Sequence, residues 1–402
     1  RIFKEAFFIA GSGRPGPVLI DVPVDVQKAE IDFNYPKQVS IRSYKPTIKG
    51  NALQVKRVAK ALKEAKRPLI CIGGGVFASH ATEEVRQLSE ITDIPVITTM
   101  MGISCFNDED HRFFGMIGTH GVKSANAAAN DCDTLLLVGA RVGDRAVNNP
   151  LKLEQSTTII HMDIDPAEIG KNIGTDIPLV GNAKDVLNQL LSVVEPMEHK
   201  EWIEHLNTYR TKRKYQKPKK GTVDPRQFIE KLSEAMPAQT TVVADVGQNQ
   251  IWAATGYKLK NGGRFLTSGG MGTMGYSLPC AMGAKMACPE RTTMTICGDG
   301  SFQMQFMEMA TCVQYGVKVK IVVMTNNRLG MVRELQDKGY DGRKVSVFLD
   351  GSPDFIKLAA AYGIPAYRVH DTKSMNKAIE ALAGEDKLML VEVCVDENAP
   401  TL

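Results

Sequence analysis

Short hydrophobic runs alternate with amphipathic segments along most of this chain. From about residue 49 to residue 194, β-branched apolar runs are separated or preceded by stretches of helical periodicity, and the alternation returns after about residue 225. Strands separated by helices in this way are typical of parallel βαβ units. The pattern predicts an α/β fold with two doubly wound parallel sheets. The predicted strands are 68–72, 95–99, 134–139, 158–163, 241–246, 264–267, 293–297, 319–325 and 388–395, and the predicted helices include 53–65, 82–91, 278–287, 302–315 and 353–362.

Two segments depart from this alternation. Residues 195–221 are dense in Lys, Arg and Glu with few apolar pairs, which indicates a linker between domains. At the start, residues 1–10 read as an amphipathic helix without an N-cap, and residues 17–22 read as a strand with no sheet to join. We interpret these two elements as the tail of a preceding α/β domain. The predicted domains are 1–45 for this remnant and its linker, 46–195 for the first complete unit, 196–223 for the linker and 224–402 for the second unit.

The bulk composition narrows the class of function. The chain has 402 residues, 43% of them hydrophobic, and a formal net charge of only +4, so it can bury cores and carries no basic stripe typical of nucleic-acid binding. We read the basic run 210–220 as a solvated linker rather than a nucleic-acid arm. No apolar run is long enough to span a bilayer and no signal-peptide pattern is visible, so we expect a soluble cytoplasmic protein with neither a nucleic-acid nor a membrane partner.

The cysteines and histidines predict neither disulfides nor a zinc site. The eight cysteines are scattered without a C-x-x-C spacing, and the seven histidines show no metal-binding spacing. Most of the cysteines stand in apolar strand or helix contexts. We expect reduced thiols in the core.

Two strand ends in the second unit carry the most informative chemistry. The strand 293–297 leads into Gly298-Asp-Gly300, where glycines let the backbone approach a ligand and the following helix directs its N-terminal N–H groups at the same point. The neighbouring run ends in Asn326-Asn327, with 25 residues between Gly300 and Asn326. Mg²⁺ on a diphosphate needs only one or two carboxylates together with amide, carbonyl and phosphate oxygens. Gly-Asp-Gly alone is usually a turn, but the two strand ends together favour a metal and diphosphate site.

This pair of strand ends resembles the thiamine diphosphate motif, and neighbouring segments narrow the resemblance to the acetolactate synthase (acetohydroxyacid synthase) family of catalytic large subunits. The similarity extends over essentially all 402 residues. It implies a central FAD-binding domain and a C-terminal domain that binds the diphosphate and Mg²⁺, and it assigns residues 1–45 to the end of a pyrimidine-binding domain. The runs that carry it are Gly13 to Pro23, Gly139 to Arg145, Asp245 to Trp252, Ser268 to Tyr276 and Asn326 to Val332.

The resemblance assigns the residues of the thiamine diphosphate site. Met274 matches the residue that props the cofactor in its bent conformation and is the catalytic residue expected in this chain; an ordinary core methionine is the structural alternative. The family usually has His where Asn249 stands, and an amide can still donate to a phosphate oxygen although it has no cationic form. The expected Mg²⁺ ligands are Asp299, Asn327 and the backbone carbonyl of Leu329. The expected cofactor-binding residues are Val246, Gly247, Gln248, Asn249, Gly272, Met274, Gly298, Asp299, Gly300, Ser301, Asn327, Leu329, Gly330 and Met331.

It also implies an FAD site in the central domain. Residues 73–75 are three glycines after a strand, which suits a backbone turn beside a diphosphate, and Asp163 follows another strand, where a carboxylate can accept from ribose hydroxyls. The family commonly has an acidic residue at Gly143 and Asp at Asn182. A domain that kept the fold without the flavin is the alternative. The expected FAD-binding residues are Gly73, Gly74, Gly75, Thr99, Met100, Thr119, His120, Gly139, Arg141, Arg145, Ala146, Asp163, Ile164, Asn182 and Ala183.

The activity implied is decarboxylation of pyruvate on thiamine diphosphate and transfer of the hydroxyethyl unit to a second 2-keto acid, the first common step of valine, leucine and isoleucine biosynthesis. Met331, Val332 and Leu335 are expected to form the substrate pocket. The family usually has Trp at Leu335, and an indole offers more contact to the extra methyl of 2-ketobutyrate, a difference of roughly 1–3 kcal/mol at most. We therefore expect a weaker preference for 2-ketobutyrate over pyruvate than in Trp-bearing relatives.

The resemblance also bears on partners. The family activates the cofactor ring with a glutamate from the first domain, and no Glu in this chain matches that motif. We expect the 402 residues alone to be inactive, and acetolactate formation by the isolated chain would contradict this. A site shared between two subunits implies a homodimer or higher oligomer, and a small regulatory subunit is left open.

Two other readings are kept. One is a different thiamine diphosphate-dependent carboligase, oxidase or decarboxylase of the same architecture, such as glyoxylate carboligase or pyruvate oxidase, which identification of the product would separate. The other is a cofactor-binding module without catalysis. The start in mid-helix argues against that module, because its first strand would need a partner.

Overall fold

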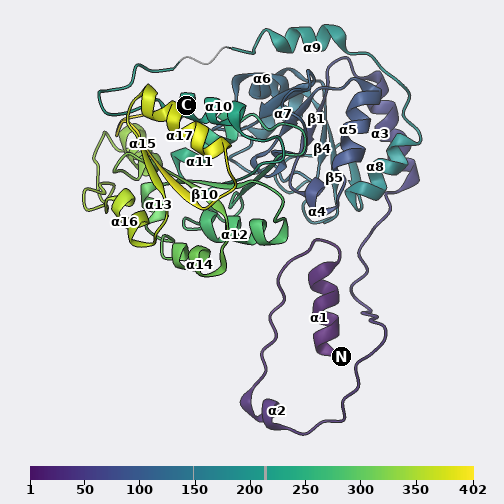
Figure 1. Ribbon diagram of the computed structural model, residues 1–402. Helices are drawn as coiled ribbons and strands as arrows, with labels where there is room; N and C mark the ends of the chain where they lie inside the picture. The colour runs from purple at the N-terminus through teal and green to yellow at the C-terminus, as the bar shows by residue number, and fades with distance from the viewer. Residues whose placement is uncertain (148, 212–214) are drawn as a thin grey trace. The chain divides into compact units, whose positions relative to one another are not determined.

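The computed structural model describes residues 1–147, 149–211 and 215–402 (Figure 1). The chain forms two compact units. The first contains Arg1–Cys105 and Ala127–Thr208, and the second contains Phe106–Asn126 and Tyr209–Leu402. Part of the basic run predicted at 210–220, residues 212–214, lies outside the described residues.

The first of two parallel sheets has the strand order β3-β2-β1-β4-β5-β6. Strand β1 (Pro68–Ile72) is buried along its whole length and pairs in parallel with β2 on one side and β4 on the other. Strands buried in this way need helices over both faces of the sheet. The other strands are β2 (Val96–Thr98), β3 (Phe113–Met116, which the second unit contains), β4 (Thr134–Val138), β5 (Thr158–Asp163) and β6 (Ile177–Val180).

Amphipathic helices connect several of the strands of this sheet along the chain. Helix α3 (Ala52–Glu64) begins after Asn51, whose side chain accepts two N–H groups of its first turn and so caps the helix. Helix α8 (Ala183–Leu191) packs against both α3 and α5 (Thr82–Thr92). The remaining elements here are α4 (Gly75–Ala78), the 3₁₀ turn η1 (Met100–Gly102), α6 (Lys123–Asp131) and α7 (Pro150–Ser156).

The stretch predicted as a linker, 196–223, contains a helix. Helix α9 (Lys200–Asn207) buries Trp202, Ile203 and Leu206, and the Trp202 indole N–H donates to the carbonyl of Pro68 at 2.9 Å. The polar composition concealed this helix, because a narrow apolar stripe is enough to attach a surface helix. The first unit therefore extends further along the chain than the composition indicated.

The first residues form helix α1 (Ile2–Gly11), as the periodicity predicts, and a short helix α2 (Val24–Lys28) follows. The strand expected at 17–22 is not formed, since these residues pair with no sheet strand in the described chain. Arg14 forms an ion pair of 2.8 Å with Glu168.

A second parallel sheet, in the order β11-β12-β10-β9-β7-β8, forms the centre of the second unit (Figure 1). Helices α12, α14 and α16 pack on one face, and α10, α11 and α17 lie on the other. The sheet is therefore doubly wound, as predicted. Its strands are β7 (Thr241–Ala244), β8 (Arg264–Thr267), β9 (Thr293–Gly298), β10 (Val319–Thr325), β11 (Ala366–Val369) and β12 (Met389–Cys394), and its helices are α10 (Pro225–Ala235), α11 (Gln248–Gly256), α12 (Ser277–Ala287), α13 (Asp299–Phe302), α14 (Glu308–Tyr315), α15 (Gly330–Gly339), α16 (Phe355–Ala361) and α17 (Thr372–Ala383).

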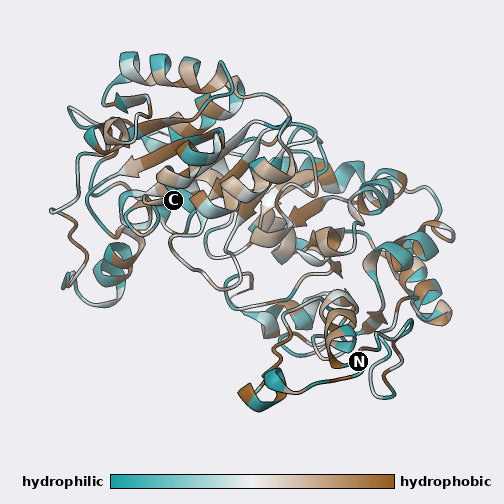
Figure 2. Cartoon of the chain, turned by 60° about the horizontal axis from the view of Figure 1, so that its bottom comes forward, coloured by the Kyte–Doolittle hydropathy of each residue, from teal (hydrophilic) through white to brown (hydrophobic). Residues whose placement is uncertain are grey.

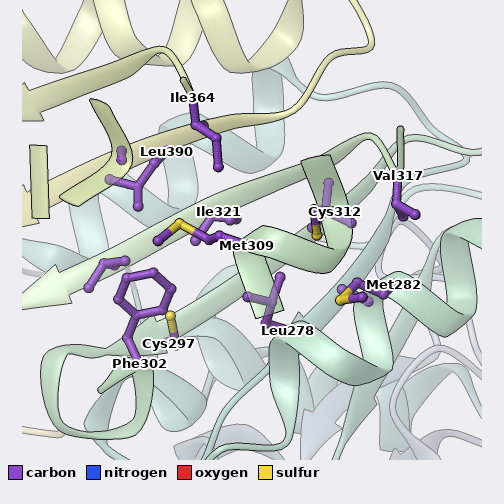
Figure 3. Close-up of a cluster of buried hydrophobic side chains, with 14 of the residues drawn as sticks. Leu278, Met282, Cys297, Phe302, Met309, Cys312, Val317, Ile321, Ile364 and Leu390 are labelled. Carbon is purple, nitrogen blue, oxygen red and sulfur yellow. The ribbon is translucent and has the colours of Figure 1, made fainter. Parts of the chain in front are cut away.

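The core of the second unit is continuous from the sheet into α12 and α14. Leu278 and Met282 of α12, Met309 and Cys312 of α14 and Ile321 of β10 belong to one buried hydrophobic cluster (Figure 3). Hydropathy colouring shows hydrophobic ribbon concentrated in the strands, while the outer helices carry hydrophilic stripes (Figure 2). Burial of this surface is the main force that holds the strand ends in place.

The helix predicted over 302–315 is broken by a turn at 303–307, which separates α13 from α14. Gln305 points inward at this turn. Its Nε2 donates to Asp245 Oδ2 at 2.9 Å, and its Oε1 accepts the N–H of Leu278 at 2.7 Å. Hydrogen bonds to two distant segments therefore override the local helical periodicity.

The eight cysteines are free thiols, as predicted. Burial raises the pKa of the Cys71 and Cys132 thiols to about 12, so both stay protonated and unreactive. In the described part of the chain, no helix is long and apolar enough to cross a bilayer.

Candidate functional site

A pocket opens at the carboxyl ends of β7, β9 and β10. The register of β9 and β10 pairs Gly298 with Met324, so the segments after these two residues emerge side by side. Most residues predicted for the diphosphate and substrate sites line the pocket. These are Val246, Gly247, Gln248, Asn249, Met274, Gly298, Asp299, Gly300, Ser301, Leu329, Gly330, Met331 and Val332, and Trp252, Met324, Asn326 and Arg328 line it as well.

The Asp299 carboxylate lies between the two strand ends and is only 1% exposed. Its Oδ2 accepts the N–H groups of Asn326 at 3.1 Å and Asn327 at 2.6 Å, and its Oδ1 accepts the N–H of Gly300 at 2.9 Å. Burial raises the pKa of Asp299 from 3.8 to about 6, although these hydrogen bonds act in the opposite direction. Among the described ion pairs, none gives this carboxylate a lysine or arginine partner. A divalent cation would compensate the buried charge.

The other two predicted metal ligands, Asn327 and the Leu329 carbonyl, belong to residues whose backbone carbonyls already accept hydrogen bonds. Asn327 has a positive φ of 53°, and its carbonyl accepts from the Arg328 guanidinium at 2.7 Å. Its side chain is not among those that line the described pocket. The Leu329 carbonyl already accepts the N–H of Arg333 at 2.9 Å, so a metal would use its second lone pair. Of the expected set, Asp299 and Leu329 are among the residues that line the described pocket, whereas Asn327 is not.

Asn249 is a structural residue as well as a lining residue. Its Nδ2 donates to the carbonyls of Asp245 at 2.7 Å and Ile296 at 3.1 Å. An amide group has two hydrogens, so both are used in this arrangement. The expected bond from this amide to a phosphate would require one of these two bonds to be released.

Asp245 is a site residue that sequence reasoning did not single out. It is fully buried, and its carboxylate accepts the backbone N–H groups of Gly275 at 3.2 Å and Ser277 at 2.8 Å. These bonds hold the segment that carries Met274. The Met274 methyl group lies 3.6 Å from the position that a Cβ on Gly300 would take, so the side chain sits over the glycine turn. No local pattern marks Asp245 for this role, because its partners are about 30 residues away in sequence.

The predicted substrate residues divide into two groups along α15. Met331 and Val332 line the pocket, whereas Leu335 is 62% exposed and is not part of the described lining. Gly272, which was predicted for the cofactor, has a positive φ of 69° and is also exposed outside the described lining. Arg328, which was not predicted, lines the pocket and forms ion pairs with Asp350 and Glu397.

In the first unit, most of the residues predicted for FAD follow the carboxyl ends of β1, β2, β4 and β5, and Asn182 and Ala183 follow β6. A Cβ on Gly73 would lie 2.2 Å from the Gly139 carbonyl oxygen, and Gly139 itself has a φ of 55°. The Gly75 N–H donates to the same oxygen at 3.0 Å. Close backbone packing therefore requires these glycines whether or not a cofactor lies beside them.

The side chains of this predicted set differ in the hydrogen bonds that they already make within the protein. Asp163 is buried and its Oδ1 accepts the N–H of Asp165 at 2.9 Å. Asn182 is the N-cap of α8, with its Oδ1 accepting the N–H of Lys184 at 3.0 Å, so its side chain has a structural task. Thr119 and His120 belong to the 106–126 segment of the second unit and are described apart from the rest. The remaining predicted residues are Gly74, Thr99, Met100, Arg141, Arg145, Ala146, Ile164 and Ala183, all in the first unit.

Comparison with known proteins adds sequence relatives to this geometry. Residues 55–190 match the family described as thiamine pyrophosphate enzyme, central domain, and residues 245–393 match the thiamine pyrophosphate enzyme, C-terminal TPP binding domain. The chain is 41% identical to a probable acetolactate synthase large subunit of Methanocaldococcus jannaschii, over 98% of this chain and 69% of the relative. It is 37% identical to the acetolactate synthase large subunit of Haemophilus influenzae and 36% identical to the isozyme 3 large subunit of Escherichia coli, each over 98% of this chain and 71% of the relative.

Proposed function

The chain belongs to the acetolactate synthase large subunits, within the thiamine pyrophosphate enzymes, and we propose that its second unit binds thiamine diphosphate and Mg²⁺ in the pocket at the ends of β7, β9 and β10. The substrates are pyruvate and a second 2-keto acid, either pyruvate or 2-ketobutyrate. The observation that carries the proposal is the buried Asp299 carboxylate between two strand ends.

The residues present fit such a group. Asp299 has a raised pKa and no cationic partner among the described ion pairs, which is the electrostatic situation that a bound cation relieves. Gly298 and Gly300 have no side chains to keep a diphosphate away from the start of α13, and their N–H groups, which donate to Ser301 Oγ and Asp299 Oδ1 in this structure, would have to exchange these partners to meet phosphate oxygens. Met274 lies over this turn and leaves the lining apolar on one side. Mg²⁺ prefers oxygen ligands of this kind, with the diphosphate supplying the rest.

When bound, thiamine diphosphate supplies the electron sink for cleaving the bond to the carboxylate of pyruvate and for forming a carbon–carbon bond to the acceptor. Asp299, Asn327 and the Leu329 carbonyl would hold Mg²⁺, and the backbone from Gly298 to Ser301 would hold the diphosphate. Met274 would support the cofactor, and the other lining side chains would exclude water around the reacting atoms.

The finer features of the enzyme are part of the same proposal. FAD would occupy the carboxyl ends of β1, β2, β4 and β5, supported by the resemblance of this domain to the family's FAD-binding domain and by the predicted residues that follow these strands. A homodimer or higher oligomer is supported by three exposed methionines, Met271, Met304 and Met307, of which Met304 packs against Gly275 beside Met274. The relatives are called large subunits, which supports a small regulatory subunit as a partner. The eight free cysteines support a reducing compartment, the cytoplasm.

Binding is the primary measurement, because the resemblance places the ring-activating glutamate outside these 402 residues. Calorimetric titration with thiamine diphosphate should show saturable binding in Mg²⁺ and strongly weakened binding in EDTA. Asp299→Ala should abolish the Mg²⁺ dependence, while Asp341→Ala, a change at a carboxylate that is 94% exposed, should leave it intact. Equal binding with and without Mg²⁺ in the unsubstituted chain would contradict the proposal. A bound flavin would appear in the absorbance spectrum of the purified protein.

A further inference from the structure

A buried amide connects three elements around the pocket. Gln248 begins α11 and is only 4% exposed. Its Nε2 donates to Glu334 Oε1 and to the Ala399 carbonyl, both at 2.9 Å, and Thr401 Oγ1 lies 3.1 Å away. Its Oε1 accepts from Asn326 Nδ2 at 3.1 Å. One side chain therefore joins the end of β10, helix α15 and residues 399–401.

Residues 399–401, named here the 399–401 strap, are fixed from several sides. The same Oε1 of Glu334 accepts the N–H of Thr401 at 2.6 Å. The Arg333 guanidinium donates to the Ala399 carbonyl at 3.1 Å, and the Trp252 indole N–H donates to the strap at 3.1 Å. Ala399 and Thr401 are both buried.

The start of α15 is packed directly on Gln248. A Cβ on Gly330 would lie 1.8 Å from Gln248 Oε1 and 2.5 Å from its Cδ, so this side chain fills the space that any larger residue would need. Gly330 and the residues after it line the pocket. Asn326, on the other side of Gln248, donates its backbone N–H to Asp299. The position of Gln248 thus bears on both the metal ligand and the helix that faces the substrate.

We propose that Glu334 is a positioning residue for the cofactor site. By accepting from Gln248 and Thr401 together, it holds Gln248 against Gly330 and keeps the end of β10 and the start of α15 in the arrangement that binds the diphosphate and Mg²⁺. The inference rests on the proposed function, since it concerns affinity for that cofactor. Glu334 itself touches no cofactor atom in this account and acts only through Gln248.

The contribution of Glu334 to cofactor affinity could come from its negative charge or from the hydrogen-bond acceptor at Oε1, and two variants separate these origins. Both hydrogen bonds end on Oε1, which also lies 3.5 Å from an Arg333 nitrogen, so an amide oxygen at the same place can accept both hydrogen bonds and loses only the charge that faces Arg333. Glu334→Gln should therefore preserve affinity, whereas Glu334→Ala leaves buried N–H groups without an acceptor. We expect the dissociation constant for thiamine diphosphate at saturating Mg²⁺ to rise about tenfold in the alanine variant, equal to about 1.4 kcal/mol, and to change less than about twofold in the glutamine variant.

The experiment is calorimetric titration of the full chain with thiamine diphosphate and Mg²⁺. A second readout is the emission of Trp252, which lines the pocket, followed in a Trp202→Phe background. The matched control is Asp337→Ala, on the same helix, whose carboxylate pairs with Arg333 and Lys344. It should bind as the unsubstituted chain does.

Loss of affinity in Glu334→Ala with rescue in Glu334→Gln supports the inference. Equal affinity in the alanine variant and the unsubstituted chain overturns it while leaving the proposed function standing. Absence of binding by the unsubstituted chain overturns the proposed function and this inference with it. If Glu334→Ala does not fold, Thr401→Pro removes one of the N–H groups that Oε1 accepts, and it takes the place of the alanine variant. Weaker binding in that variant supports the inference, and unchanged binding overturns it.

Discussion

Asp299 should make the metal-free protein less stable as the pH rises, and Asp299→Asn should remove this effect. Burial raises the pKa of Asp299 in the folded protein above its usual 3.8 to about 6. The folded state therefore binds this proton more tightly than the unfolded state does. The stabilisation that results is fully present below pH 3.8 and is lost as the pH rises through about 6.

The magnitude follows from the shift. A change of one pKa unit corresponds to about 1.36 kcal/mol, so a shift of about two units gives about 3 kcal/mol between acidic pH and pH 8. Asparagine does not ionise, and its oxygen can still accept the N–H groups of Asn326 and Asn327. Its NH₂ group would face the N–H of Gly300, which lowers stability by an amount that does not depend on pH. The pH-dependent part of the difference is therefore the quantity to measure.

The assay is urea denaturation in EDTA between pH 5 and pH 8, followed by Trp252 fluorescence with both proteins in a Trp202→Phe background. The free energy of unfolding of Asp299→Asn relative to Asp299 should increase across this range by about 1.4 kcal/mol, roughly half of the total, because the other half of the stabilisation is lost below pH 5. Asp341→Asn, at an exposed carboxylate, should show no such trend. At pH 8, saturating Mg²⁺ and thiamine diphosphate should stabilise the protein with Asp299 but not the Asp299→Asn variant. A difference that stays constant from pH 5 to pH 8 would refute the electrostatic reasoning.

Three further predictions concern other parts of the chain. Gly330→Ala should lower the free energy of unfolding by about 1–3 kcal/mol in urea denaturation, because the new Cβ would displace the hydrogen-bonded Gln248; Gly339→Ala, in the same helix with open space at its Cβ, is the control and should not destabilise. Leu335→Trp should raise the ratio of the 2-ketobutyrate product to acetolactate in a competition assay of a catalytically active form that includes the family's ring-activating glutamate, by at most the roughly 10- to 200-fold that about 1–3 kcal/mol allows, and an unchanged ratio would count against the role of this position. Asn51→Ala should cost the first unit about 1 kcal/mol by removing the cap of α3, measured by thermal denaturation, whereas Asn51→Asp should restore it.

Most strand positions could be predicted from the sequence, because buried parallel strands appear in it as short apolar runs. β1, β5, β8 and β10 have the predicted bounds. β3, β6 and β11 were missed: Gly115 interrupts the apolar run of β3, Pro178 interrupts that of β6, and the burial of β11 is incomplete, so their apolar signals are weak. The glycine turn and the Asn pair were found for the same reason, since both follow directly from strands that the pattern identifies.

The contacts that shape the site were not readable, because they join segments distant in sequence. Gln248 meets Glu334 and Thr401 across 86 and 153 positions, and no periodicity encodes such a pair. Asn182 was predicted as a ligand residue, yet a helix N-cap explains the same residue type at the same place. The helix predicted through Gln305 failed because a single inward side chain outweighed the local pattern.

The register between β9 and β10 has a consequence for how this chain can change over evolution. Gly298 of β9 pairs with Met324 of β10. Because the sheet fixes this register, Asp299 must follow β9 directly and the Asn326-Asn327 pair must follow β10 directly if they are to lie side by side. The residues between, in the 303–307 turn, α14 and the turn after it, make up most of the 25-residue interval and lie outside the two strands. Insertions at the partly exposed turn after α14, residues 316–318, should be tolerated, whereas changes at Gln305 or within α14 would disturb the core, and a single-residue insertion within β10 would shift every following side chain relative to Asp299. The interval between the two motifs is therefore free to drift among relatives, while the offsets from the strand ends are not.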